Sequence, residues 1–509
     1  MQQKRNAVQT KGKLMTKKKA VNKKTQRKRK RKKSKLKFKH ILIIGCVIYV
    51  FSAVYGAMKP LPAGISKAYE PSKTNDVKLL IDKTYEKNNK MYYEHEIFNE
   101  QLKTIKAADD FIILDMFLFN DTYDGDVKFP KLTTELTHAL INKKKENPDI
   151  QIYMLTDPIN SFYGSYTPAH YKMLRDNGIS VYETNLVKLR DSNPIYSGLW
   201  RPTLRFFGNN ENGLIPNIFS KEAPNVTVRG FARLLNMKAN HRKTLVTEDA
   251  AIISSSNPHD PSGHHQNVAV KVTGQLQEDL IKSEVHALNM SGSNLSASDF
   301  AIKNRAYSND MDYKTALVTE GKVKEAILRN INSMKSGDNI KMGMFYLSDR
   351  DIVKSLLNAS ERGVEVRIIL DVNKEAFGKE KPGIPNKPVA HELVSKSDDH
   401  IKVRWAVSHG EQFHAKYTLF RSLSTGESTV ILGSANLTRR NVGDYNMETD
   451  VVISGKSDLS VFKQLNDTFD AMWENKYAHV TDDYDVQKDP SFIKDVLYRV
   501  QEFTGLSSF

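Results

Sequence analysis

The chain has 509 residues, of which 39% are hydrophobic, so it can bury a sizeable core in two or three domains or in one large two-lobed body. Its formal net charge is +17, but residues 1–40 hold 19 Lys and Arg and no Asp or Glu. Subtracting these 19 charges leaves residues 41–509 at −2. Because proteins that grip nucleic acid carry a basic excess on the binding domain itself, we expect no nucleic-acid partner.

The first 75 residues predict a tail, a membrane anchor and a linker. Residues 1–40 are expected to form a disordered basic tail, because a dense run of like charges repels itself. The next segment, Ile41–Met58, has 18 residues without a charge, which is near the lower limit for a transmembrane helix. Residues 59–75 follow as a juxtamembrane linker. The single cysteine, Cys46, excludes intramolecular disulfides and reads as a small apolar residue in lipid.

The basic flank also predicts an orientation. Positive charge on the amino side of an apolar segment keeps that side in the cytoplasm. We therefore expect a single-pass protein of the cell membrane with an extracytoplasmic body. A cleaved signal peptide is the alternative, but 40 residues exceed an ordinary charged n-region, and Tyr55-Gly56-Ala57 fits the cleavage pattern poorly.

The body repeats one order of elements. Short apolar runs rich in β-branched and aromatic residues predict strands at Asp110–Phe119 and Gln151–Asp157, and again at Asn339–Leu347 and Val364–Asp371. Helical spacing follows at Lys322–Met334 and Asp351–Ser360. This alternation predicts an α/β fold with two similar lobes, each a mixed β-sheet flanked by helices.

The lobes are expected to span residues 76–300 and 301–480, with the boundary in the Ser-, Asn- and Asp-rich stretch Ser291–Asp312. Residues 481–509 predict a C-terminal helix whose apolar side packs on the body. Its apolar residues are Phe492, Ile493, Val496, Leu497, Val500 and Phe503. The alternative is that this helix makes a second membrane contact. We disfavour it because the charged residues of the helix form an ordinary solvated face. These are Lys494, Asp495, Arg499 and Glu502.

Each lobe contains one His-x-Lys segment that opens a predicted hairpin. The segments are Asn240-His241-Arg242-Lys243 and Phe413-His414-Ala415-Lys416. Residues i and i+2 of a strand point to the same face, so each His shares a face with its Lys. The second strand of each hairpin then ends in a turn of small residues with Asn. The turns bring four more side chains towards the same place: Ser255, Asn257, Ser434 and Asn436.

This grouping suits a phosphodiester. Lysine supplies positive charge, and Asn and Ser supply hydrogen-bond donors, for the phosphate oxygens. Two imidazoles can divide the work of nucleophile and proton donor near neutral pH. A lone His-x-Lys occurs often by chance, but here the whole unit recurs. A lysine beside each histidine argues against a metal. His259, His264 and His265 are weak candidates for metal ligands and fit a polar loop better.

The duplicated His-x-Lys with Gly-Ser-x-Asn resembles the phospholipase D superfamily over roughly residues 76–480, and most of all bacterial cardiolipin synthase-like membrane proteins. The resemblance implies a two-lobed α/β fold, a phosphohistidine intermediate, and neither metal nor other cofactor. It implies His241 as nucleophile and His414 as general acid, an order that the motif leaves open. Carried over as phosphate-holding residues are Lys243, Lys416, Asn257 and Asn436, supported by Ser255 and Ser434. Glu448 fits the downstream carboxylate that orients a histidine.

The first copy departs from the family pattern. Ser254 stands where the family has Gly, and Glu248-Asp249 where it has a single Asp. Asn267 lies near the expected position of the downstream carboxylate, and Arg421 replaces an early Asp in the second copy. These changes affect the orienting residues, while His, Lys and Asn are intact in both copies. An active site is therefore expected.

The anchor and the near-neutral body favour a phospholipid substrate, with phosphatidylglycerol first. The resemblance implies a phosphatidyltransferase of the cardiolipin synthase type or a phosphodiesterase that releases phosphatidic acid. An anchored nuclease of the same superfamily and a non-catalytic scaffold that binds lipid headgroups are the alternatives. The acceptor and the oligomeric state stay open.

Overall fold

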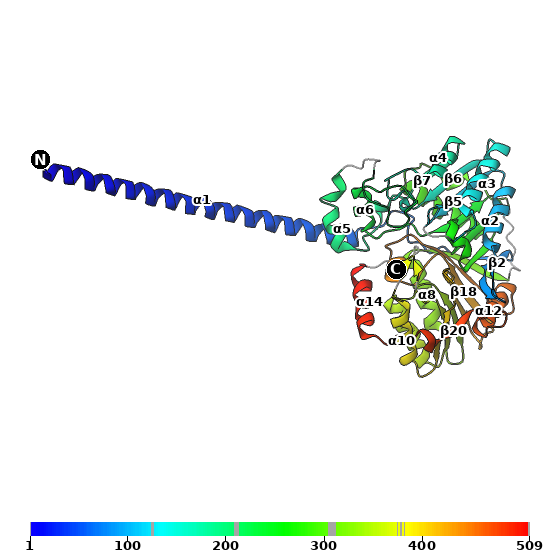
Figure 1. The fold of residues 1–509 in the computed structure, drawn as a ribbon. Coiled ribbons are helices and arrows are strands. Elements are labelled where there is room, and N and C mark those ends of the chain that lie inside the picture. Colours follow the sequence, from blue (N-terminus) through cyan, green and yellow to red (C-terminus); the bar gives the residue numbers. More distant parts are fainter. Residues whose placement is uncertain are drawn as a thin grey trace.

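The computed structural model describes residues 2–123, 127–207, 213–303, 312–373, 375–376, 379–380 and 382–506. One long helix, α1 (Gln2–Met58), projects from a body built on two large β-sheets (Figure 1). Of the described helices, α1 alone is long and apolar enough to cross a membrane. It ends at Met58, where Pro60 and Pro62 prevent its continuation.

The basic tail is helical, so the predicted disorder of residues 1–40 is wrong for the residues that the structure describes. Lys and Arg are good helix formers, and the apolar segment that follows provides a helix from which the tail extends without a new nucleus.

The first lobe holds a seven-stranded sheet. Its strands, from edge to edge, are β2 (Val77–Asp82), β10 (Asn267–Val272), β9 (Ala251–Ser254), β8 (Lys243–Thr247), β5 (Phe111–Met116), β6 (Gln151–Thr156) and β7 (Ser180–Glu183). Strands β5, β6 and β7 are parallel, whereas β8, β9, β10 and β2 pair antiparallel.

The second lobe holds a nine-stranded sheet. Its order is β1 (Ser72–Thr74), β11 (Tyr313–Thr319), β19 (Thr449–Lys456), β18 (Glu427–Gly433), β17 (Lys416–Arg421), β12 (Asn339–Met344), β13 (Glu365–Leu370), β16 (Ile401–Ala406) and β20 (Thr481–Asp483). The segment from β11 to β16 repeats the order and directions of β2 to β7. The predicted α/β fold with two similar lobes is thereby confirmed.

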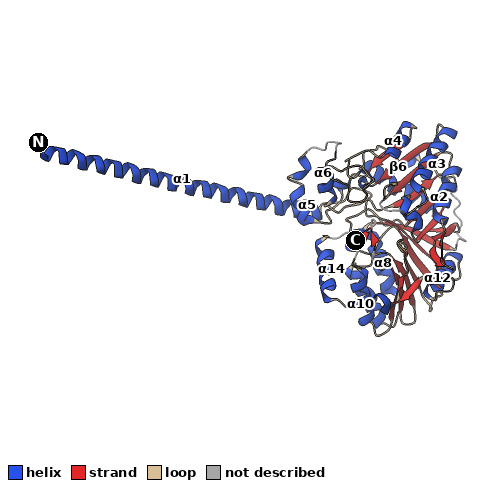
Figure 2. Cartoon of the chain, viewed as in Figure 1, coloured by secondary structure: helices blue, strands red, loops and turns tan. Residues whose placement is uncertain are grey.

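Helices cover the outer faces of both sheets (Figure 2). The first lobe has α2 (Glu96–Ala107), α3 (Leu132–Glu146) and α4 (Ala169–Asp176); the second has α8 (Gly321–Ser333), α9 (Arg350–Glu361) and α10 (Asn386–Ser395). Between the sheets lie α7 (Gln275–Met290) and α12 (Ser460–Trp473). The two sheets also contact each other directly, through β9 and β10 of the first and β18 of the second. The largest core cluster therefore joins the lobes, with residues such as Ile253 and Leu432 from both sheets.

Shorter elements complete the described chain. They are the hairpin of β3 (Thr84–Lys87) and β4 (Lys90–Tyr93), the pair β14 (Glu375–Ala376) and β15 (Lys379–Glu380), and the helices α5 (Pro194–Trp200), α6 (Val228–Leu234), α11 (Arg439–Val442) and α13 (Tyr484–Gln487). Single 3₁₀ turns occur at Pro158–Ser161, Leu186–Lys188, Leu204–Phe206, Asp260–His264 and Ala297–Asp299.

The ends of the second lobe differ from the expected boundaries. Strand β1 lies in the predicted linker, yet it pairs with β11, and β20 lies beyond residue 480, yet it pairs with β16. Both add edge strands that the apolar pattern does not reveal. Of the predicted lobe boundary, residues 304–311 lie outside the described part of the chain.

The C-terminal helix, α14 (Phe492–Thr504), forms as expected but faces the other way. Its polar side packs on the body: Tyr498 and Glu502 are buried, and Arg499 pairs with Glu392. Its apolar side is outward, with Phe492 77% and Phe503 83% exposed. The expectation that this apolar side is buried is therefore wrong, because charged partners on the body select the polar side.

Candidate active site

The two His-x-Lys segments occupy matching places in the two sheets. Lys243 opens β8 and Lys416 opens β17, and these strands lie beside β5 and β12, the first parallel strands of their sheets. The chain just before each strand contacts the opposite lobe: the backbone N–H of His241 donates to the Met447 carbonyl at 2.9 Å, and that of Gln266 donates to the Gln412 carbonyl at 3.1 Å. Both half-sites therefore lie at the seam between the lobes.

In each lobe, one buried carboxylate holds the backbone just before the histidine. Asp157 accepts from the backbone N–H of Asn240 at 2.6 Å, and Asp371 accepts from that of Phe413 at 2.9 Å. These aspartates follow β6 and β13 in the two lobes. Asp157 stands at the end of the predicted strand Gln151–Asp157, and its contact with Asn240 makes it a positioning residue.

Each histidine is oriented by a side chain from the other lobe. The His241 Nδ1 lies 3.0 and 3.1 Å from the two carboxylate oxygens of Glu448, at the start of β19. The His414 Nδ1 lies 3.1 Å from the amide oxygen of Asn267, at the start of β10. Since Nδ1 is engaged in both rings, Nε2 is the nitrogen that each ring can offer to a substrate. Glu448 thus orients His241, and Asn267 plays the same part for His414.

Ser255 and Ser434 support these orienting groups. The Ser255 hydroxyl donates to Asn267 at 3.0 Å, and the Ser434 hydroxyl donates to Glu448 at 2.5 Å. Glu448 also accepts from the side-chain amide of Asn441. Both serines were expected to contact substrate, and their hydroxyls point instead at the groups that hold the histidines.

The two lysines are enclosed and point at their own half-sites. The Lys243 ammonium donates to the His241 carbonyl at 2.6 Å, and the Lys416 ammonium donates to the His414 carbonyl at 2.8 Å. Each ammonium also lies over an aromatic ring, Phe117 at 5.1 Å and Phe345 at 5.3 Å. A lysine held this way keeps donors for an anion beside the histidine.

Phe117 and Phe345 are site residues that the motifs did not reveal. Their ring centroids lie 4.7 Å from that of His241 and 5.0 Å from that of His414. Phe117 directly follows β5 and Phe345 directly follows β12, in the apolar runs that revealed the duplication. Comparing the two runs residue by residue would have found them.

The asparagines differ in their present contacts. The Asn257 side-chain oxygen accepts from the backbone N–H of Leu118 at 3.2 Å. The side-chain oxygen of Asn436 is buried and has no hydrogen-bond partner among the described residues. Both are buried and follow the hairpin strands β9 and β18.

Burial governs the protonation of the site. It lowers the pKa of His241 and of His414 well below the ordinary value, and the nearby ammonium groups of Lys243 and Lys416 lower both further. Lysine charges of each lobe thus act on the histidine of the other. Burial also lowers the pKa of Lys243 to about 7 and raises that of Glu448 to about 8. An anion that enters would reverse the shifts of the lysines and histidines.

The remaining motif residues lie elsewhere. Glu248 accepts from Lys303 and from the backbone of Asp109, at the far end of β8. The residue between His241 and Lys243, Arg242, pairs in the interior with Glu320. Among the described residues, no group of three or more His, Cys, Asp or Glu side chains is arranged to hold a metal ion, and this includes His259, His264 and His265.

Comparison with known proteins found a family match within the second lobe. Residues 327–473 match the family model described as "Cardiolipin synthase, PLD-like domain". This part of the chain is similar to a phospholipase D-like domain. The matched segment contains His414, Lys416, Asn436 and Glu448, and the expected resemblance to the phospholipase D superfamily is confirmed.

A solved structure shows a similar fold across both lobes. Phosphatidylserine synthase from Haemophilus influenzae Rd KW20 superimposes with a TM-score of 0.51 at 10% identity, over 86% of this chain and 95% of that protein. Polyphosphate kinase from Porphyromonas gingivalis gives a TM-score of 0.42 at 12% identity, over 85% of this chain and 53% of that protein. No curated protein matches the chain by sequence.

The enclosed lysines predict anion binding that sulfate can report, since its charge does not change near neutral pH. Lys243→Met and Lys416→Met should each weaken sulfate binding about 10- to 100-fold, the range of a lost charge-assisted hydrogen bond. Because the pKa of Lys243 is about 7, binding to the unaltered protein should weaken as pH rises through that value. Isothermal titration calorimetry measures both effects.

Lys341→Met is the control, since that lysine is also buried but pairs with Asp470 away from the site. Sulfate affinity that is the same in all four proteins would contradict the assignment of a phosphate site.

Proposed function

We propose that this protein is a membrane-anchored enzyme of the phospholipase D type that transfers a phosphatidyl group through a phosphohistidine. The observation that carries the proposal is the pair of cross-lobe contacts, His241 with Glu448 and His414 with Asn267. Because these contacts engage Nδ1 of both rings, both Nε2 atoms remain available to one phosphodiester, beside the two enclosed lysines.

In the first step, Nε2 of His241 attacks phosphorus, and the bond from phosphorus to the leaving oxygen breaks. Nε2 of His414 gives its proton to that oxygen. Lys243 and Lys416 hold the non-bridging oxygens, with Asn257 and Asn436 as further donors.

In the second step, the acceptor hydroxyl gives its proton to His414 and attacks phosphorus. The bond from phosphorus to His241 breaks, and the starting enzyme returns. If the acceptor is a glycerol hydroxyl of a second phosphatidylglycerol, the products are cardiolipin and glycerol. If it is water, the product is phosphatidic acid.

The roles of the two histidines follow from their unlike partners. A carboxylate at Nδ1 stabilises the positive charge that develops on a ring whose Nε2 becomes bonded to phosphorus, and that developing charge in turn lowers the raised pKa of Glu448. Only His241 has such a partner, Glu448, whereas Asn267 is a neutral amide. We therefore assign His241 as nucleophile and His414 as general acid. The substrate's own negative charge raises the pKa of His414, so the acid form arises when the phosphodiester is bound.

A phospholipid substrate is supported by three features. The apolar part of α1 supplies an anchor, the body carries almost no net charge, and the matched family model describes cardiolipin synthases. By the positive-inside rule, the 19 basic residues of the tail lie in the cytoplasm and the body outside. Phosphatidylglycerol would supply both the phosphatidyl donor and an acceptor hydroxyl.

Product analysis on phosphatidylglycerol vesicles tests the reaction. The unaltered enzyme should yield cardiolipin and glycerol, and His241→Ala or His414→Ala should lower the rate about 1000-fold or more, since each removes a reacting group. His138→Ala, on the exposed face of α3, is the control and should keep full activity.

Phosphatidic acid in place of cardiolipin would identify water as the acceptor. If neither lipid product forms while single-stranded DNA is cleaved in a histidine-dependent way, the lipid proposal is wrong and the nuclease alternative stands.

A second prediction concerns pH. Asn267→Asp places a carboxylate at His414 Nδ1, which favours the protonated ring and raises its pKa. Because His414 must be protonated to act as the acid, activity should persist to higher pH, and the alkaline limb of the kcat profile should move to higher pH. Asn99→Asp, on the exposed side of α2, should leave the profile unchanged. A limb that stays in place in Asn267→Asp would argue against His414 as the acid.

A further inference from the structure

The body packs against the last turns of α1. The hydroxyl of Tyr49 donates to the Ile195 carbonyl of α5 at 3.0 Å, and the backbone N–H of Asp191 donates to the Gly56 carbonyl at 2.9 Å. Between these contacts, Gly198 of α5 meets Ala53 so closely that a Cβ at Gly198 would overlap it. Figure 1 shows α5 against the end of α1.

These contacts conflict with a body that stays wholly outside the bilayer. The uncharged segment Ile41–Met58 is about 27 Å long at 1.5 Å per residue, slightly less than the roughly 30 Å of hydrocarbon in a bilayer. The body already contacts α1 from Tyr49 onward, and the exposed residues Ile41–Ile48 before it span only about 12 Å. We propose that one apolar face of the body, described below, enters the outer half of the bilayer. This proposal rests on the proposed membrane anchor and adds the position of the body relative to the bilayer.

The part of the body that flanks α1 has a surface suited to lipid. Ile195 and Leu199 lie one turn apart on the outer side of α5 and are 52% and 50% exposed. Phe206 and Phe207, in and after the next turn, are each 67% exposed. Large apolar side chains gathered on a surface mark an interaction site, and at this depth the partner is acyl chain.

Helix α14 continues this surface. Its outward side carries Phe492, Ile493, Val496, Leu497, Val500 and Phe503. Its end meets the start of α5, since Gly505 packs against the carbonyl of Ser192, and Asn193 caps α5. We call the exposed apolar side chains of α5, Phe206, Phe207 and α14 the bilayer face.

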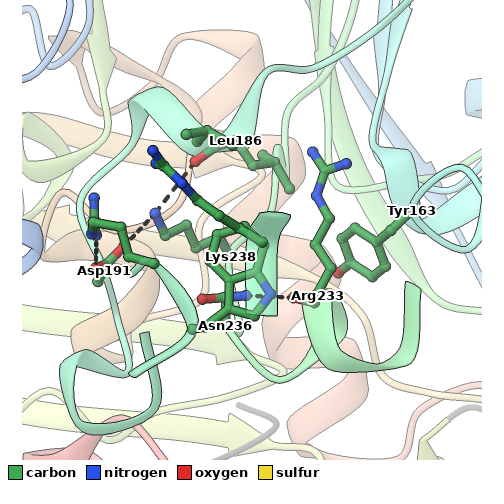
Figure 3. A pocket seen from close by; sticks show the side chains of 10 residues that line it. Tyr163, Leu186, Asp191, Arg233, Asn236 and Lys238 are labelled. Atoms are coloured by element: carbon green, nitrogen blue, oxygen red, sulfur yellow. Dashed lines mark hydrogen bonds and ion pairs between the residues drawn. The ribbon is translucent and has the colours of Figure 1, made fainter. Parts of the chain in front are cut away.

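Basic groups lie beside the bilayer face, in a pocket next to the end of α1 (Figure 3). Arg201, Arg205, Arg233 and Lys238 line it, against the single carboxylate of Asp191. Trp200 adds an indole N–H that is buried without a hydrogen-bond partner among the described residues. Cationic and indole groups beside an apolar surface suit the headgroup level of a bilayer, where lipid phosphates accept from them.

The bilayer face also adjoins both half-sites. The Ser192 hydroxyl, before α5, donates to the Met237 carbonyl, four residues before His241. Glu502 of α14 accepts from the backbone N–H of Arg439, three residues after Asn436. The site would therefore sit at headgroup depth and take its substrate from the leaflet that the face enters.

Fluorescence quenching in vesicles tests the depth of the bilayer face in the full chain, without an activity assay. The native Cys46 serves as one labelling position. In a Cys46→Ala background, Leu199→Cys, Phe503→Cys and Leu423→Cys supply single positions for an environment-sensitive NBD label. Leu423 is the control, since it is exposed and lies beyond the end of β17 opposite to Lys416.

In vesicles of phosphatidylcholine and phosphatidylglycerol, labels at 199 and 503 should lose fluorescence to a doxyl-labelled lipid and resist aqueous iodide. The label at 423 should do the reverse. Lipid quenching at 46 with iodide quenching at 199 or 503 overturns the bilayer face and leaves the anchor standing. Iodide quenching at 46 overturns the anchor and the inferred depth together.

Discussion

The hydrogen bond that each histidine of the candidate site makes with a side chain of the opposite lobe is the constraint on which the site depends. Neither lobe alone can orient its own imidazole, since Glu448 and Asn267 reach across the seam. The large core shared by the two sheets keeps these contacts in register. Because one partner is a carboxylate and the other an amide, a nearly symmetric frame carries two chemically different histidines. Duplication thus supplies the geometry, and the difference between Asn267 and Glu448 supports the proposed division of roles.

The position of the candidate site is linked to the position of the body relative to α1. The loops that follow β18 and precede β8 hold the half-sites, and both end against α5 or α14. The polar side of α14 is used for packing, so its apolar side is left outward, near the end of the proposed membrane anchor α1. Amphipathic surfaces that would be a liability in water become useful when the surface lies at a membrane.

Much of the fold follows from the sequence because the pattern occurs twice. The apolar runs of β5 and β12 and the two His-x-Lys hairpins predicted the strands and the lobes. The roles of Ser255 and Ser434 could not be predicted, since spacing brings a hydroxyl near a site without showing where it points. The outward face of α14 was hidden for a related reason. Periodicity shows that a helix is amphipathic, whereas ion pairs such as Arg499 with Glu392 decide which side the body takes.

The most direct test of the central claim is to trap the covalent intermediate. The enzyme would be quenched in base during turnover of a phosphatidylglycerol labelled in its phosphate, and its peptides would be mapped by mass spectrometry. The account predicts a phosphatidyl group on His241, none on His414, and no adduct in His241→Ala. A labelled His414, or turnover with no histidine adduct, would contradict it.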